Sequence, residues 1–141
     1  MEEKAVVVLD TNVFVSGLLS PAGAPGLILR RFRQLDFEIA TSKEQIREIQ
    51  LVLKRPSLVK AIPPGTAKEA LRFLLSFKKL ATILNPPKLD WKFKDRGDHF
   101  LLDLVAHVDA DFLVTGDKAL LALKLVQSCS VVSPVEFLAS L

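Results

Sequence analysis

Short apolar runs alternate with longer amphipathic segments along most of the chain. The runs are rich in β-branched or aromatic residues and are followed by turn residues, which is typical of buried strands. They occupy residues 5–9, 37–40, 81–84, 112–114 and 130–132. Because helical patterns separate these runs, the sequence predicts a mostly parallel sheet with helices on both faces, and therefore an α/β protein.

The segments between the apolar runs carry helix start signals. A hydroxyl residue is followed three positions later by Glu or Gln, the capping-box pattern, in "SKEQ" (42–45), "TAKE" (66–69) and "SPVE" (133–136). A further helix is expected to begin near Pro25 in "APGLILRRFRQL". The prolines of residues 56–65 allow only a break or a short helix there. Residues 85–98 form the longest loop-like segment and are expected to form a functional rim.

The length and the composition fit one domain spanning residues 1–141, with enough apolar residues for a sizeable core. No apolar run approaches the roughly 18–20 residues that a membrane-spanning helix needs. The start of the chain, "MEEKAVVVLD", is acidic and unlike a signal peptide, so we expect a cytoplasmic protein without a membrane segment. The single cysteine, Cys129, excludes an internal disulfide and a Cys-rich zinc site, and is expected to be a small buried filler.

Four carboxylates stand where strands are predicted to end or where the following helices begin. Asp10 directly follows the first run, Asp117 lies just beyond a later one in "TGD", and Asp98 opens an apolar helix. Since ligands bind at the carboxyl ends of parallel strands, these three side chains are expected near one edge of the sheet. Glu48 joins them only if the helix that carries it leans over that edge.

Each of these acids also has a purely structural interpretation. Asp10, Asp98 and Asp117 suit helix N-caps, and Glu48 could be a solvated helical glutamate, with Glu44 as its natural competitor. The set is more specific than any member, because two carboxylates about 4 Å apart repel by roughly 4 kcal/mol at an effective dielectric near 20. A hard cation such as Mg²⁺ or Mn²⁺ would relieve that repulsion. Such ions promote hydrolysis of phosphodiesters.

The distribution of charge along the chain is suited to a polyanionic partner. The formal net charge is +3, and leaving out the four acids raises the surplus to about +7. One basic cluster surrounds Trp91 and Phe93 within the long loop; its cations are Lys88, Lys92, Lys94 and Arg96. Clusters of this kind can follow a phosphate backbone, although they could equally be solvated faces of helices and loops.

Four motifs in order along the chain resemble those of PIN-domain proteins: "VVLDTNVFVSGLLSP", "TSKEQIREIQLVLKRP", "DRGDHFLLDLVAHVDADFLVTGD" and "SPVEFL". The nearest resemblance is to the prokaryotic group described as toxin components of toxin–antitoxin systems. It implies a three-layer α/β/α sandwich and a nuclease that uses Mg²⁺ or Mn²⁺ to hydrolyse RNA. It also implies neutralisation by a small antitoxin protein and a homodimer.

The resemblance assigns roles residue by residue. The catalytic and metal-binding acids would be Asp10, Glu48, Asp98 and Asp117. Thr11 and Asn12 would orient Asp10 and contact the substrate, and Thr115 would supply a supporting hydroxyl. Asp95 would serve as a supporting ligand, since "DRGD" stands where relatives often carry a longer acidic run.

Other functions are less well supported by the sequence. A haloacid-dehalogenase-like phosphatase needs a second Asp two residues after the first, and Asn12 occupies that position. A serine hydrolase would need a G-x-S-x-G turn, which is missing. His99 and His107 are expected to be packing or surface residues. A non-catalytic PIN-fold module that binds RNA or protein, and a housekeeping RNA-processing nuclease, remain open alternatives.

Overall fold

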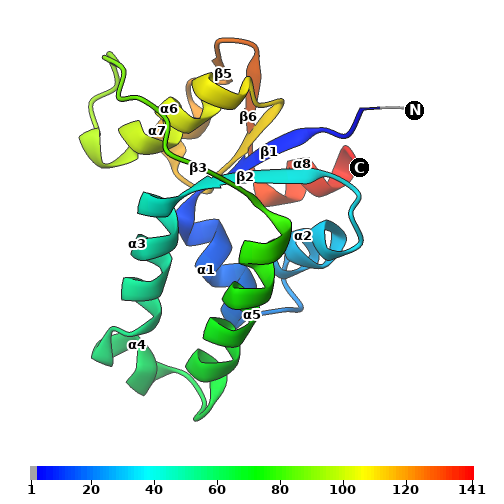
Figure 1. The fold of residues 1–141 in the computed structure, drawn as a ribbon, viewed down its shortest axis with the longest axis vertical. Coiled ribbons are helices and arrows are strands. Elements are labelled where there is room, and N and C mark those ends of the chain that lie inside the picture. The colour runs from blue at the N-terminus through cyan, green and yellow to red at the C-terminus, as the bar shows by residue number, and fades with distance from the viewer. Residues whose placement is uncertain (1–2) are drawn as a thin grey trace.

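The computed structural model describes residues 3–141. The strands are β1 (Val6–Leu9), β2 (Glu38–Ser42), β3 (Thr82–Leu84), β4 (Phe112–Val114), β5 (Leu125–Val126) and β6 (Cys129–Val132). The helices are α1 (Thr11–Leu19), α2 (Ala24–Arg33), α3 (Lys43–Leu53), α4 (Pro56–Ala61), α5 (Thr66–Leu80), α6 (His99–Val108), α7 (Lys118–Leu121) and α8 (Pro134–Ala139), with a 3₁₀ turn, η1 (Arg96–Asp98), before α6. Figure 1 shows their arrangement.

The strands form one sheet in the order β3-β2-β1-β4-β6-β5. All neighbouring pairs are parallel except β5 and β6, which are antiparallel. The crossover helices therefore place the carboxyl ends of β1, β2, β3, β4 and β6 at one edge of the sheet. The predicted mostly parallel sheet is confirmed.

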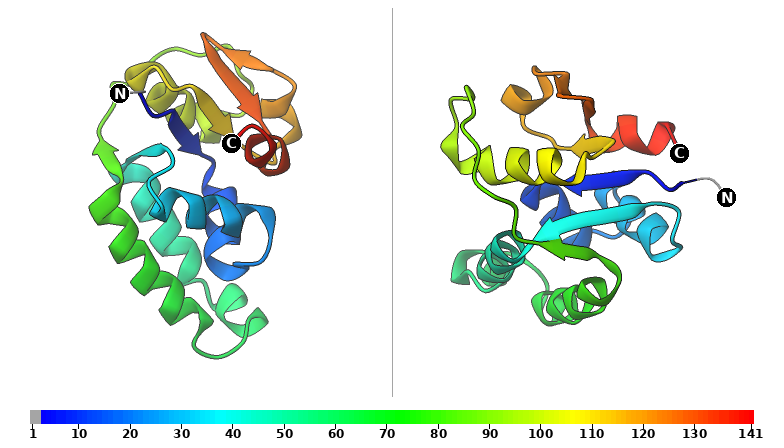
Figure 2. Two further views of the ribbon diagram at one scale, coloured as in Figure 1. Left: turned by 90° about the vertical axis from the view of Figure 1, so that its right-hand side faces the viewer. Right: turned by 45° about the horizontal axis from the view of Figure 1, so that its top comes forward.

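Helices cover both faces of the sheet, which gives three layers (Figure 2). In β1, Val7 and Leu9 face a core shared with α1, α2, α5 and α8, whereas Val8 faces a core shared with α6. A strand buried on both faces explains why residues 5–9 are apolar without alternation. The α/β/α sandwich that the sequence predicted is therefore the observed fold.

Aromatic rings link the elements of the larger core. Phe14 contacts Phe77 of α5 with ring centroids 4.2 Å apart, and Phe77 lies 5.2 Å from Phe32 of α2. The series continues through Phe37 to Phe137 of α8, whose ring centroids are 5.1 Å apart. These contacts fasten α1, α2, α5 and α8 to the same face of the sheet.

A helix begins at each of the three predicted capping-box patterns, but the predicted N-cap is correct at only two of them. Ser133 and Glu136 form a complete capping box at α8, and the Ser42 hydroxyl accepts the Gln45 backbone N–H at α3. Thr66, by contrast, is the first residue of α5 rather than its N-cap. Gly65 precedes it with φ of 87°, a conformation that glycine adopts without a steric penalty.

No single helix in residues 3–141 is long and apolar enough to cross a membrane; α1 and α2 meet the criteria only as a pair bent by 89°.

Candidate active site

Asp10 lies at the carboxyl end of β1 and is held from two sides. It is only 7% exposed, and its backbone N–H donates to the Val114 carbonyl of the neighbouring strand β4. The buried Thr115 hydroxyl donates to Asp10 Oδ2 at 2.6 Å, and the Asn12 backbone N–H donates to Asp10 Oδ1 at 3.2 Å. These two bonds fix the direction of the carboxylate. The hydroxyl of Thr115 is thus a direct partner of Asp10.

Asp117 follows β4 and caps α7. Its Oδ1 accepts the backbone N–H groups of Ala119 and Leu120 at 2.7 and 3.3 Å. Its own backbone N–H donates to the Thr115 hydroxyl at 3.0 Å, so a single threonine orients both Asp10 and Asp117. Because capping occupies only Oδ1, the structural and the functional interpretation of Asp117 are compatible.

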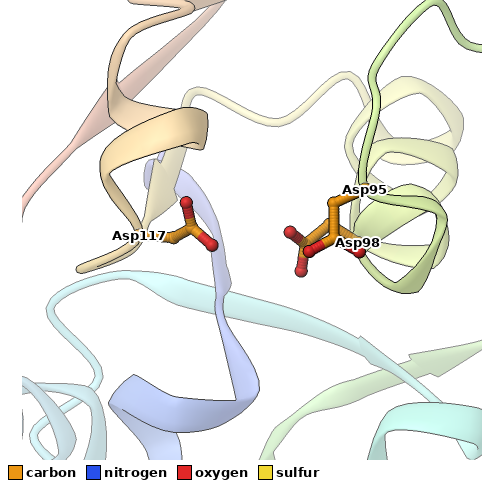
Figure 3. Close-up of side chains that lie close together, drawn as sticks. All are labelled: Asp95, Asp98 and Asp117. Carbon is orange, nitrogen blue, oxygen red and sulfur yellow. The ribbon is translucent and has the colours of Figure 1, made fainter.

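Asp98 and Asp95 approach Asp117 from the opposite side. Each of the three offers a carboxylate oxygen that lies within 4.8 Å of the others, and Figure 3 shows Asp95 and Asp98 on the segment before α6, facing Asp117. Asp95 caps η1 by accepting the Gly97 backbone N–H at 3.0 Å. Asp95, expected only as a supporting ligand, is thus a full member of this triad.

Asp98 is the most perturbed carboxylate of the group. Its Oδ2 is the one buried side-chain N or O atom within residues 3–141 that has no hydrogen-bond partner. Burial, together with the negative charges of Asp10, Asp95, Asp117 and Glu48, raises the pKa of Asp98 to about 6. An unpaired carboxylate oxygen among like charges is stable only if the group is protonated or a cation is bound.

Glu48 lies on α3 beside Asp10 and is half-buried. Burial raises its pKa; the Thr11 side chain opposes this shift, whereas the charges of Asp10 and Glu44 add to it. Glu44 is exposed, whereas Glu48 lies close enough to Asp98 for its negative charge to raise the pKa of that carboxyl group. The geometry thus directs Glu48, rather than Glu44, toward the other carboxylates. Both Glu48 and Asp10 lie outside the 4.8 Å triad.

Gln45 positions this part of α3, and the sequence did not single it out. Its side chain is 1% exposed and donates from Nε2 to the Leu9 carbonyl at 2.6 Å. It also accepts the Thr41 hydroxyl and lies 3.5 Å from the Thr11 hydroxyl. These bonds tie α3 to the end of β1, one helical turn before Glu48. The "SKEQ" capping box is consequently only half formed, because the Gln45 side chain is engaged elsewhere.

The predicted role of the polar pair after Asp10 needs correction in part. Asn12 orients Asp10 through its backbone N–H, and its exposed side chain is directed to solvent. The buried Thr11 contacts Gln45 and Glu48 rather than Asp10. The hydroxyl that contacts Asp10 comes from Thr115, which is far away in sequence.

The remaining titratable side chains near the sheet have structural roles. His99 Nε2 contacts the Phe93 carbonyl at 2.8 Å, and His107 is exposed. Cys129 is buried, and burial together with Asp111 and Asp109 raises its pKa to about 12, which excludes a reactive thiolate. Asp103 is buried and accepts hydrogen bonds from the long loop.

The donor set fits a divalent cation. All the candidate ligands are carboxylate oxygens, which Mg²⁺ and Mn²⁺ prefer over softer nitrogen or sulfur sites. Two carboxylates about 4.8 Å apart still repel by roughly 3–4 kcal/mol at an effective dielectric near 20. The unpaired oxygen of Asp98 offers a ready ligand, and a cation there would remove the repulsion among the acids.

Comparison with known proteins agrees with the resemblance noted in the sequence. A PIN-domain family model matches residues 6–119. The uncharacterized protein MJ1680 of Methanocaldococcus jannaschii is 33% identical over 121 residues, which cover 86% of this chain and 76% of that protein. A chain in the crystal structure of VapBC2 from Rickettsia felis bound to a DNA fragment from their promoter has the same fold, with a TM-score of 0.60 and 14% identity. That similarity covers 91% of this chain and 98% of the other. The match to the family model over residues 6–119 includes every predicted site residue, and the chain belongs to the PIN-domain family.

Proposed function

We propose that this chain is a metal-dependent endoribonuclease that hydrolyses RNA phosphodiester bonds at the site formed by Asp10, Glu48, Asp98 and Asp117. Mg²⁺ or Mn²⁺ would be the cofactor. The observation that carries the proposal is the unpaired, buried Oδ2 of Asp98, a residue that offers a carboxylate oxygen within 4.8 Å of those of Asp95 and Asp117. In a purely structural cluster the negative charge of Asp98 would have no compensating partner, whereas a cation-binding site needs such an unpaired carboxylate oxygen as a ligand.

The side chains divide the work of such a site. Asp98 and Asp117 would hold the ion, with Asp95 beside them, while Thr115 keeps Asp10 and Asp117 in fixed orientations. Asp10 and Glu48 would complete the ligand set from the opposite side. A bound Mg²⁺ or Mn²⁺ supplies Lewis acidity toward phosphate oxygens and activates water for hydrolysis. No nucleophilic side chain is needed, in agreement with the inert Cys129.

Substitution of the two glutamates of α3 tests the proposal with a matched control. Glu48→Gln is expected to abolish Mn²⁺-dependent cleavage of single-stranded RNA, while Glu44→Gln, one turn earlier and exposed, should retain it. Wild-type protein should gain about 2.7 kcal/mol of unfolding free energy at a Mn²⁺ concentration 100 times its Kd. Unchanged melting with saturating Mn²⁺, or full cleavage in excess EDTA, would contradict the proposal and favour a non-catalytic binding module.

The cellular role proposed is that of the toxin in a toxin–antitoxin pair, acting in the cytoplasm as a homodimer. The support is the family membership and the fold shared with a chain of the VapBC2 assembly. A housekeeping RNA-processing nuclease is the alternative. Co-expression with a small protein encoded next to this gene separates the two, because only an antitoxin would form a stable complex and suppress RNA cleavage.

A further inference from the structure

The segment between β3 and α6 has a defined shape although residues 85–95 form no helix or strand. The buried Asp103 of α6 accepts two hydrogen bonds on Oδ1, from the Leu89 backbone N–H at 2.9 Å and from Trp91 Nε1 at 2.7 Å. A third contact joins His99 Nε2 to the carbonyl oxygen of Phe93 at 2.8 Å. A loop this long is expected to be mobile unless it is anchored, and these bonds fix it along α6.

Side chains in this segment alternate in character. Trp91 and Phe93 are half-buried and pack against the core beneath α6. Lys88, Lys92 and Lys94 are exposed, and none of them forms an ion pair within the described residues. These cations, with the exposed Asp90 among them, are thus the charged groups that the segment offers to a ligand.

The basic segment leads directly into the carboxylate cluster. Lys94 is followed by Asp95, which belongs to the triad with Asp98 and Asp117. In Figure 1 the segment rises past α6 to a bend at the upper left and then turns back down into the start of that helix. A polyanion bound to the segment would thus lie next to the acids. The acids themselves repel a polyanion, so nearby cations are needed to hold it there.

We propose that residues 88–94 form a preformed rim that binds the phosphate backbone of single-stranded RNA through Lys88, Lys92 and Lys94, and that Asp103 is the positioning residue of this rim. The inference rests on the proposed nuclease function and names how its substrate is held. Interleaved aromatic and basic residues are typical of proteins that bind single-stranded nucleic acid by stacking its bases on the aromatic rings. Here the aromatic rings serve as anchors, so the rim contacts backbone rather than bases and binds without sequence preference.

Salt dependence of RNA binding tests the rim. In an Asp10→Asn background, which is expected to be unable to cleave, the triple variant Lys88→Gln, Lys92→Gln, Lys94→Gln should bind single-stranded RNA with a weaker dependence on salt. The slope of log K against log[salt] should fall by about 2, since each phosphate contact contributes about 0.7. Affinity for different homopolymers should fall by the same factor.

A matched control removes three cations far from the rim. Lys60 of α4 and Lys68 and Arg72 of α5 are exposed, and α4 and the start of α5 lie at the opposite end of the molecule in Figure 1. Substitution of these three by Gln should leave the slope unchanged. Equal slopes of log K against log[salt] for the two triple variants would overturn the proposal that the rim binds RNA. If the rim variant bound RNA normally but lost binding to a polyglutamate peptide, the segment would be a docking site for an acidic protein and the proposal would be wrong.

Variants of the anchor test the positioning role of Asp103. Asp103→Ala should raise KM for RNA about tenfold or more with little change in kcat, whereas Asp103→Asn, which retains an acceptor oxygen, should restore KM. If Asp103→Ala does not fold, Trp91→Phe removes one N–H donor while keeping an aromatic ring and should raise KM less. An unchanged KM in Trp91→Phe, and in Asp103→Ala if it folds, would overturn the positioning role.

The rim and the nuclease activity can fail separately. Wild-type protein that bound RNA through the rim but never cleaved it would disprove the nuclease and leave the rim standing. Wild-type protein that cleaved RNA while the rim variants kept the original salt slope would do the opposite.

Discussion

At the scale of single residues, two carboxylates of the site, Asp117 and Asp95, use one oxygen for the fold and leave the other for chemistry. Asp117 caps α7 with Oδ1, and Asp95 caps η1 in the same way. From the sequence alone, helix capping and metal binding are competing interpretations of each aspartate. The sequence does not show that one carboxylate oxygen can cap the helix while the other stays free for a metal ion. The three-dimensional structure shows that both interpretations can hold for the same residue.

Asp98 should make the metal-free protein sensitive to pH. Its folded-state pKa of about 6 lies above the ordinary value of 3.8, so its contribution to stability is full below about pH 4 and is lost as the pH rises through 6. In EDTA at neutral pH, Asp98→Asn should therefore be more stable than wild type by about 1 kcal/mol after allowance for solvent screening, or roughly 3 °C in Tm.

Melting curves of both proteins from about pH 4 to neutral, with EDTA and with Mn²⁺, measure this effect. Wild type should lose Tm with rising pH in EDTA and regain it with Mn²⁺, and Asp98→Asn should show a smaller loss and a smaller gain. A variant that is less stable than wild type in EDTA at neutral pH would show that the charge of Asp98 is compensated by the protein itself.

At the scale of elements, the sequence predicted what depends on local pattern. The five parallel strands were found because each is a short, nearly continuous apolar run, and the α8 capping box because its partners are three residues apart. The short β5 was missed, since two residues carry no periodicity. The long-range contacts of Gln45 and Asp103 were not predicted, because the partners lie 36 and 12–14 residues away and no local signal reveals them.

Gln45 should couple α3 to the site. Gln45→Met keeps the length of the side chain but leaves the buried Leu9 carbonyl and Thr41 hydroxyl without a partner. We expect a loss of about 1–3 kcal/mol in unfolding free energy. Since Gln45 lies one turn before Glu48, the variant should also bind Mn²⁺ more weakly.

Urea titration and Mn²⁺-dependent melting measure the two effects of Gln45→Met separately. Gln50→Met, at a half-buried position farther along α3, serves as the control and should change neither quantity. A destabilised Gln45→Met protein with normal Mn²⁺ affinity would show that Gln45 supports the fold without positioning Glu48.

At the scale of the whole molecule, the sheet separates two apolar cores that share its strands. The aromatic series runs through the core on the α2 side, and the single tryptophan, Trp91, packs on the α6 side. Because Val7 and Val8 of β1 face opposite cores, unfolding of one core removes the support of the other. We therefore expect one cooperative transition.

Phe32→Ala tests this coupling. The ring of Phe32 is 2% exposed and lies 5.2 Å from Phe77, so truncation should cost about 3–5 kcal/mol. Trp91 fluorescence, on the far side of the sheet, should report the same lowered urea midpoint as far-ultraviolet circular dichroism. If Trp91 kept the wild-type midpoint, the two cores would be separate folding units. The milder Phe32→Leu serves if the alanine variant does not fold.

The burial of Cys129 has a practical consequence for chemical labelling. The thiol is 1% exposed and its pKa is raised to about 12, so it remains a poorly nucleophilic, shielded group in the folded protein. Alkylating reagents and mild oxidants should leave it unmodified while the fold is intact. A cysteine introduced on the outer side of the loop beside α6 would then be the single reactive handle, suited to a fluorophore or a spin label without removal of the native thiol.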